Sequence, residues 1–224
     1  MQPVRRRLGM IARSLAILSA FCFAAAPCAF ADSPNVAGDV IAVRMWAYGT
    51  PPDQARRDLF LKDDVYVRER LETATDGALH VRLKDDTVIR LGSATSVVLD
   101  EFVYAPDADA TTLLANVSKG VCRFLTSKTT KKDVKVTTPA ATIVARGTIF
   151  SVKVAADGST EVWVTTGRVD VTPRDGSAPG VVNAGQSVLA PIAGGGLQLD
   201  FPIPAPDPGL GETGNIIFHR GKHK

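Results

Sequence analysis

Short runs of alternating apolar and polar residues recur along most of the chain. Successive side chains of a β-strand point to opposite faces, so this alternation is typical of strands that bury only one face. The clearest block is 134–167, where Val162 and Val164 fall on one face of a predicted strand and Glu161 and Trp163 on the other. The pattern predicts strands at 40–44, 65–68, 79–83, 88–91, 96–102, 121–126, 168–172, 181–182 and 187–190, and four more within 134–167.

Turn-forming residues separate these predicted strands. Pro139 has no amide donor and biases Thr138 away from helical geometry, so a turn is expected there. Gly147, Gly158 and Gly167 mark later corners, because a positive φ angle costs little only for glycine.

The order of strands and corners predicts the fold class. Segments 79–83 and 88–91 should pair as a hairpin with the apolar side chains of 79–83 facing inward. The one helical candidate, 53–61, has few apolar positions and is expected to be a short helix or a loop. We predict an all-β domain of stacked short strands, a β-solenoid or β-roll, with a β-sandwich as the second choice.

The two ends differ from the middle. Four arginines, an apolar run over 15–26 and Ala29-Phe30-Ala31 make the N-terminus similar to a secretory signal peptide. We expect cleavage after Ala31 and a periplasmic or secreted protein, the alternative being a retained anchor at 14–31. The expected organisation is a signal peptide at 1–31, an N-terminal strand and connecting segment at 32–62, a β domain at 63–191 and a Gly/Pro-rich tail at 192–224.

Charge and cysteine counts change when the leader is set apart. The chain has 26 Lys and Arg against 23 Asp and Glu, but the leader holds four Arg and no acid, which leaves 22 against 23. Without the leader the charge is nearly balanced, so the composition does not favour nucleic acid as a partner. It does not favour stable insertion into a membrane either. Only Cys122 remains outside the leader, so no internal disulfide is expected, and a buried apolar role is favoured for this thiol.

An ordered set of motifs carries a family resemblance. The motifs are Thr138-Pro139, Gly147-Thr148-Ile149-Phe150-Ser151-Val152, Asp157-Gly158, Val162-Trp163-Val164, Gly167 and Ala184-Gly185-Gln186. Over roughly 63–191 the chain resembles the FecR family, a bacterial periplasmic domain named after an iron-dicitrate transport regulator. Regulators of this type also carry a cytoplasmic anti-sigma segment and a membrane helix, which this sequence does not show, so direct sigma-factor contact is not expected. The resemblance implies turn or inward anchor roles for Thr138, Pro139, Gly147, Thr148, Phe150, Gly158, Gly167 and Gly185.

Motifs for catalysis or metal binding are weak. Gly209–Gly214 matches a dinucleotide-binding pattern but has no preceding strand or following helix. His219 and His223 lie in the tail without a cluster of further ligands, and His80 should be solvated on the outer side of its strand. The acid pairs Asp63-Asp64, Asp85-Asp86 and Asp100-Glu101 are expected at turns or edges. We therefore expect no enzyme, no cofactor and no metal site.

Three residues are candidates for partner contact. Trp163 should point away from the core, with Ile149 beside it if the two strands pair, and is either covered by a second β layer or part of an exposed aromatic patch. Arg146 either pairs with a carboxylate across its turn or offers its guanidinium to an acidic partner.

The expected function is binding rather than chemistry. We expect a non-enzymatic FecR-type protein that binds another envelope protein or an envelope ligand, in envelope signalling. The alternative is a module for cell-wall or surface polysaccharide, for which Trp46, Tyr48 and Trp163 would have to line one groove. A carbohydrate-active enzyme with two convergent acids comes third.

Overall fold

The computed structural model describes residues 35–105, 110–126 and 131–200. These segments contain strands, turns and bends and no helix, which confirms the all-β prediction. Within the same segments, no helix is long and apolar enough to cross a bilayer.

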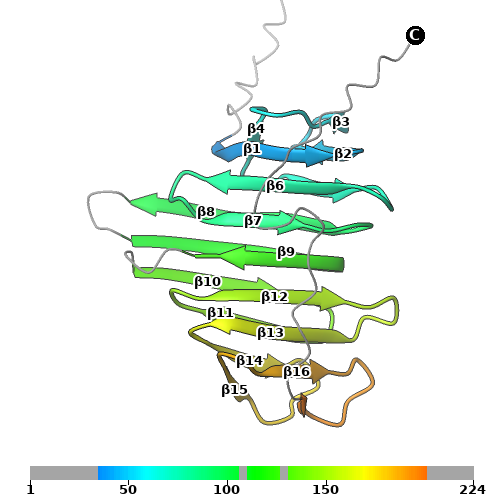
Figure 1. Ribbon diagram of the computed structural model, residues 1–224, viewed down its shortest axis with the longest axis vertical. Coiled ribbons are helices and arrows are strands. Elements are labelled where there is room, and N and C mark those ends of the chain that lie inside the picture. The colour runs from blue at the N-terminus through cyan, green and yellow to red at the C-terminus, as the bar shows by residue number, and fades with distance from the viewer. Residues whose placement is uncertain (1–34, 106–109, 127–130, 201–224) are drawn as a thin grey trace, which may run out of the picture. The chain divides into compact units, whose positions relative to one another are not determined.

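Seventeen strands follow one another along the described chain (Figure 1). Their bounds are β1 Val36–Arg44, β2 Ala47–Thr50, β3 Arg57–Asp58, β4 Asp64–Tyr66, β5 Arg70–Thr73, β6 Ala78–Leu83, β7 Val88–Leu91, β8 Ser96–Ala105, β9 Ala110–Leu125, β10 Lys131–Thr137, β11 Ala141–Ala145, β12 Ile149–Val154, β13 Thr160–Thr166, β14 Arg168–Pro173, β15 Gly180–Asn183, β16 Ser187–Ala190 and β17 Gln198–Asp200.

The strands divide into two sheets. Sheet A has the order β4-β1-β6-β7-β9-β12-β13-β16-β17. Sheet B has the order β3-β2-β5-β8-β9-β10-β11-β14-β15. All these pairings are antiparallel except β9 with β10, which is parallel. The two sheets share a core as in a sandwich, while layers are added in chain order as in a solenoid, so that Figure 1 shows the strands stacked one above another.

Strand β9 belongs to both sheets. Its first part pairs with β8 and β10 in sheet B, and residues 120–125 pair with β7 and β12 in sheet A. Gly120 lies where the strand passes from one sheet to the other, with a φ of +87°. A Cβ atom there would lie 2.5 Å from the Cα of Thr95, so only glycine fits this crossing.

One hydrophobic cluster fills the space between the sheets. Phe124 of β9 and Phe150 of β12 stack in it with ring centroids 5.1 Å apart. The predicted hairpin is confirmed as β6 paired with β7, and Leu79, Val81 and Leu83 are buried as expected. Cys122 is also buried, which raises the pKa of its thiol far above the ordinary value, so it is inert as a nucleophile.

Buried threonines link successive layers at a constant spacing. The amide of Thr95 donates to Thr73 Oγ1 (3.0 Å), the amide of Thr148 donates to Thr126 Oγ1 (2.6 Å), and the hydroxyls of Thr160 and Thr138 are bonded (2.8 Å). Each of these pairs is 22 residues apart in sequence. The stack therefore has a repeating layer that the sequence did not show as a visible repeat.

Some sequence expectations were wrong or incomplete. The helix considered at 53–61 is not formed: turns lead into the two-residue strand β3, which pairs with β2. Strands β2, β3 and β5 were not predicted, and β9 begins about a dozen residues before its predicted start at Val121. Residues 1–34 and 201–224, and with them the signal peptide, His219 and His223, lie outside the described residues.

Candidate functional site

A straight line of polar and aromatic side chains crosses the outer face of sheet A. Arg90 on β7 pairs in register with Arg123 on β9, Arg123 with Ser151 on β12, Ser151 with Trp163 on β13, and Trp163 with Ser187 on β16. Directly opposed residues of neighbouring strands point to the same face, so these five side chains form one row across five strands. We call it the sheet A row.

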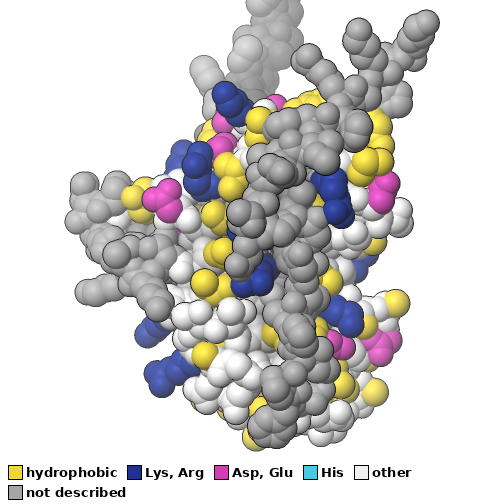
Figure 2. Space-filling model, viewed as in Figure 1, with side chains coloured by type: hydrophobic (Ala, Val, Ile, Leu, Met, Phe, Trp, Pro, Cys, Tyr) yellow, Lys and Arg dark blue, Asp and Glu magenta, His cyan; other side chains and the backbone are white. Residues whose placement is uncertain are grey.

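Ser151, Trp163 and Ser187 of the sheet A row are shielded from solvent although they do not belong to the core, and Arg90 and Arg123 are half-buried. Trp163 is 7% exposed and Ser151 is 0% exposed, whereas neither is a member of the hydrophobic core cluster. Their strand neighbours Val162, Val164, Phe150 and Val152 face the core instead. Figure 2 shows Lys and Arg side chains scattered over the described surface, both near its middle and along its margins.

The predicted contact residues take different places. Trp163 faces away from the core as expected, but with so little exposure it forms no open aromatic patch. Ile149 is half-buried on the same face of β12 as Ser151, and it pairs with Thr166 rather than with Trp163. Their role as contacts stays a prediction.

Arg146 lies away from the sheet A row. It follows β11 at the corner to β12, and its Nε donates to Asp133 Oδ1 at 2.6 Å across the β10–β11 hairpin. Both side chains are more than half exposed, so this ion pair stabilises the fold by less than about 1 kcal/mol. The carboxylate partner is the structural alternative that the sequence had offered for this residue.

His80 does not have the solvated position expected from the sequence. It lies on the outer side of β6, opposite Arg90 of β7, but is only 7% exposed. Its place extends the shielded line of the sheet A row by one strand. The alternation of apolar residues correctly predicted the face of β6 on which His80 lies. It could not predict how much of that face is covered.

The family-motif residues lie at corners or in the core. Thr138 and Thr148 are buried in the inter-layer hydrogen bonds, and Phe150 is fully buried. Pro139 follows β10 in the turn to β11. The glycines have the positive φ angles that their corner roles require: Gly147 (58°), Gly158 (89°), Gly167 (84°) and Gly185 (80°).

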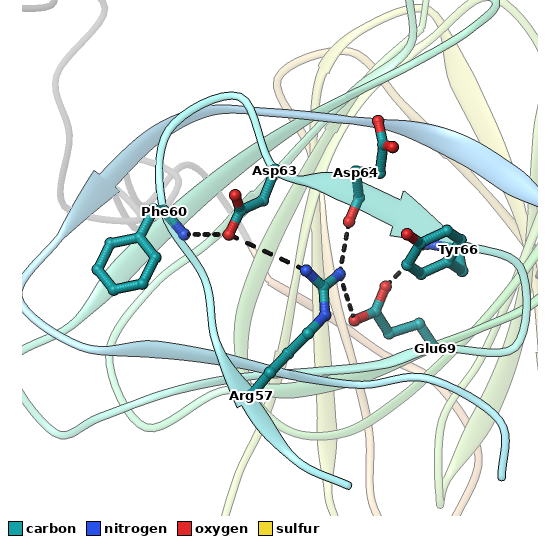
Figure 3. A network of polar contacts seen from close by, with 6 residues as sticks. All are labelled: Arg57, Phe60, Asp63, Asp64, Tyr66 and Glu69. Carbon is teal, nitrogen blue, oxygen red and sulfur yellow. Dashed lines mark hydrogen bonds and ion pairs between the residues drawn. The ribbon is translucent and has the colours of Figure 1, made fainter. Parts of the chain in front are cut away.

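A second polar cluster, which the sequence did not reveal, surrounds Glu69 (Figure 3). Glu69 is 0% exposed; its carboxylate accepts from Arg57 Nη2 at 3.0 Å and from the Tyr66 amide at 2.8 Å. Burial raises the pKa of Glu69, and the Tyr66 amide and Arg57 oppose that shift. A Cβ on Gly49 would lie 2.1 Å from Glu69 Oε1, so this glycine makes room for the carboxylate.

The Glu69 cluster holds the first strands together. Arg57 comes from β3, and it also donates to the carbonyl oxygen of Asp64 in β4 at 2.5 Å. It thereby joins an edge strand of sheet B to an edge strand of sheet A. Glu69 sits between two exposed arginines in sequence, a pattern that normally indicates a solvated segment.

The remaining candidate motifs do not converge. Tyr48 lies on the outer side of β2 in sheet B and is covered by the Arg56 guanidinium, 3.6 Å from the ring centroid, whereas Trp163 lies in sheet A. Asp85 is buried in a turn, where it accepts from the amide and hydroxyl of Thr87. In the described segments, no group of three or more His, Cys, Asp or Glu residues could hold a metal ion.

Two solved structures are similar to part of the chain, and the one with a TM-score of 0.50 agrees with the fold. Two crystal structures of a candidate anti-sigma factor from Parabacteroides distasonis ATCC 8503 are similar, with 21% identity and TM-scores of 0.50 and 0.49. Each match covers 59% of this chain and 59% of that protein, so the chain spans little more than half of its length. No curated protein matches the chain.

The model of the family described as FecR protein matches residues 69–170, from the start of β5 to β14. This range holds Thr138, Gly147, Thr148, Phe150 and Gly167, on which the resemblance in sequence rested. Over residues 69–170, a little less than half of its length, the chain is therefore similar to the FecR family.

Proposed function

We propose that the protein is a non-enzymatic, periplasmic FecR-type domain that binds another envelope protein and acts in envelope signalling. The family match over residues 69–170 supports the signalling role. The sheet A row is the observation that carries the binding role, because it aligns side chains of one chemical character on a hydrogen-bonded sheet.

The chemistry of the row indicates the kind of partner. Two guanidinium groups and an indole N–H only donate hydrogen bonds, and the hydroxyls of Ser151 and Ser187 can donate as well. Such a line fits a protein segment rich in acceptors, with carboxylates opposite Arg90 and Arg123. Antiparallel pairing on both sides of each central strand fixes the spacing of these groups before a partner arrives, which lowers the entropic cost of binding.

The polysaccharide alternative has weaker support. It required Trp46, Tyr48 and Trp163 to line one groove, but Tyr48 and Trp163 lie on the outward faces of different sheets. Sugar rings bound by stacked aromatics would therefore have no continuous platform between these two residues.

Site-specific photo-crosslinking in living cells tests the proposal. A photoreactive residue at Thr165, which is exposed on β13 on the same side as Trp163, should capture a discrete envelope protein. The same residue at Thr172, exposed on β14 in sheet B, should capture none. The protein should be recovered from the periplasmic fraction with Asp32 as its first residue.

A matched pair of charge reversals makes this test specific. Arg90→Glu should abolish the crosslink from Thr165, whereas Arg168→Glu, the same change on β14, should leave it intact. Equal crosslinking from both positions, or a crosslink that survives Arg90→Glu, would count against the sheet A row as the binding surface. A protein retained in the cytoplasm with its leader intact would rule out the periplasmic role.

A further inference from the structure

A second in-register row of side chains crosses the outer face of sheet B. Its members, from β9 to β15, are Leu114, Lys135, Val144, Asp170 and Val181. Their strand neighbours, such as Ile143 and Val171, belong to the hydrophobic core, so the row faces outward. We call it the sheet B row. Apolar and charged side chains alternate along it, and its two charges have opposite signs and lie on either side of Val144.

A further pair of charges lies beside this row. Asp133 precedes Lys135 by two residues on β10 and shares its face. Arg168 precedes Asp170 by two residues on β14 and shares its face as well. Both strands pair antiparallel with β11, which lies between them, so β10 and β14 run in the same direction (Figure 1). The order of charges is therefore negative then positive on β10, and positive then negative on β14.

These charges do not neutralise one another within one copy of the chain. The backbones at Lys135 and Asp170 are separated by two strand spacings, which is about 10 Å. All four charged side chains are exposed. Among the described residues, none forms an ion pair with Lys135, Arg168 or Asp170. These three charges are therefore available to a second molecule.

We propose that two copies of this chain associate through the outer faces of sheet B, related by a two-fold axis that runs parallel to β11 above Val144. Such an axis lays one sheet on the other and exchanges the positions of β10 and β14. Lys135 of each copy then faces Asp170 of the other. Asp133 of each copy faces Arg168 of the other. Each of these four charges meets one of opposite sign, which is the self-complementarity that a two-fold interface requires.

The uncharged side chains of the face fit the same axis. Val144 meets its own copy, and Leu114 of one copy faces Val181 of the other. Val181 is 52% exposed in the single chain, and this contact covers it. The row beside the sheet B row on β10, β11 and β14 consists of Thr137, Thr142 and Thr172. Threonines are small, so they allow two sheets to approach to the usual spacing of about 10 Å.

Arg146 follows β11 and lies close to the axis, where it approaches the same residue of the other copy. Its Nε donates to Asp133 Oδ1 at 2.6 Å, which turns the guanidinium toward β10 and away from the axis. A carboxylate can accept several hydrogen bonds, so Asp133 can also accept from Arg168 of the other copy. The two carboxylates beside the two Arg146 side chains offset their repulsion.

The size of the face predicts a weak dimer. Five strands about 4.8 Å apart and about five residues long present roughly 400 Å² per copy, half of the about 800 Å² per partner in a standard interface. The dimer should therefore form only at high local concentration, and salt should weaken it by screening the charge pairs. Sheet A lies across the core from this contact, so a dimer would offer two partner surfaces and bind more tightly by avidity, a consequence that rests on the proposed function.

Sedimentation equilibrium of the purified protein at about 10 to 500 µM tests the association. A monomer at every concentration overturns the proposal. Lys135→Asp and Asp170→Lys should each weaken the dimer by about tenfold or more, because like charges then face each other. Glu101→Lys is the matched control: it reverses a charge in line with the row on β8, where the axis places nothing opposite because β15 ends sheet B. This control should change the dissociation constant by less than about twofold.

Mixing the two variants separates lost complementarity from misfolding. Lys135→Asp and Asp170→Lys should each fail to dimerise alone. In an equal mixture, each carboxylate of one variant faces an ammonium group of the other, so a dimer with one copy of each should form with about the affinity of the unchanged protein. A mixture that stays monomeric overturns the proposal, and so do single variants that dimerise as tightly as the unchanged chain.

A cysteine crosslink locates the contact. A short bismaleimide should join two Val144→Cys chains, because position 144 meets itself on the axis. It should not join two Thr165→Cys chains, whose new thiol is exposed on sheet A. Cys122 is buried and does not compete. Dimers that are joined through Thr165→Cys and not through Val144→Cys overturn the proposal.

The dimer and the proposed partner can fail separately. In the photo-crosslinking experiment, the photoreactive residue at Thr172 should give a product of twice the mass of the chain, which differs from the capture of another protein. A dimer without any capture from Thr165 would contradict the proposed partner and leave the dimer intact. Capture from Thr165 by a protein that sediments as a monomer would do the reverse.

Discussion

At the scale of single residues, glycines in the left-handed region of φ are held there for different reasons. Gly120 has a φ of +87° and lies against Thr95 at the crossing of β9. Gly176 has a φ of +83° but has open space where a side chain would project. The first position is restricted by both backbone conformation and packing, and the second by backbone conformation alone.

Substitution of these two glycines by alanine should therefore give unequal losses of stability. Gly176→Ala should lower the free energy of unfolding by about 1 kcal/mol, the cost of a left-handed alanine. Gly120→Ala should lower it by a further 1 to 3 kcal/mol or so, because the new methyl group overlaps backbone atoms of Thr95. Urea denaturation of the two variants measures the difference in the free energy of unfolding. Equal losses would show that Thr95 can move aside for the new methyl group.

At the scale of elements, hydrogen bonds of buried threonines connect each layer to the next. Strand pairing connects only adjacent strands within a sheet, whereas these hydroxyls bond to backbone groups at the corners between strands. Thr126 shows this most fully, because its Oγ1 donates to the carbonyl of Thr148 at 2.7 Å and accepts from the Thr148 amide at 2.6 Å.

Thr126→Val keeps the shape of the side chain and removes this pair of bonds. The Thr148 amide would then be buried without an acceptor, at a cost of about 1 to 3 kcal/mol in the free energy of unfolding. The control Thr165→Val changes an exposed residue of β13 and should alter stability by less than about 0.5 kcal/mol. Chemical denaturation of both variants tests this, and equal effects would mean that the corner bond contributes nothing.

At the scale of the whole molecule, the family match covers only the middle of the stack. Residues 69–170 include β6 and β13, whose neighbours β1 and β16 lie outside that range. Buried core residues such as Val40, Val65 and Val188 also lie outside it. The outer strands are thus part of the folded unit and cover edges that would otherwise be open.

A fragment of residues 69–170 should consequently fold poorly. It would leave β6 and β13 as unpaired, apolar edges, which favour aggregation. Residues 35–200 should show one cooperative thermal transition by circular dichroism, whereas the fragment should show none or precipitate. A cooperative transition in the fragment would mean that residues 69–170 fold independently of the flanking strands.

Alternation and turn residues predicted most of the fold, because a half-buried strand imposes a period of two on its sequence. Strands such as β7 and β16 had the bounds expected, whereas β2 and β5 were missed because they are four residues long and mostly polar or small. The face of Trp163 followed from Val162 and Val164. Its shielding did not, since that depends on cross-strand register and on what covers the sheet. Glu69 was missed because only the fold brings Arg57 beside it.

The spacing of 22 residues between bonded threonines has a consequence for how such a chain can change in length. Gain or loss of one complete layer of this length would keep the threonine corners above and below it in phase. An insertion of any other length moves a threonine away from its partner, unless the extra residues bulge out as a loop. The chain should therefore tolerate the gain or loss of a whole layer better than insertions or deletions of other lengths.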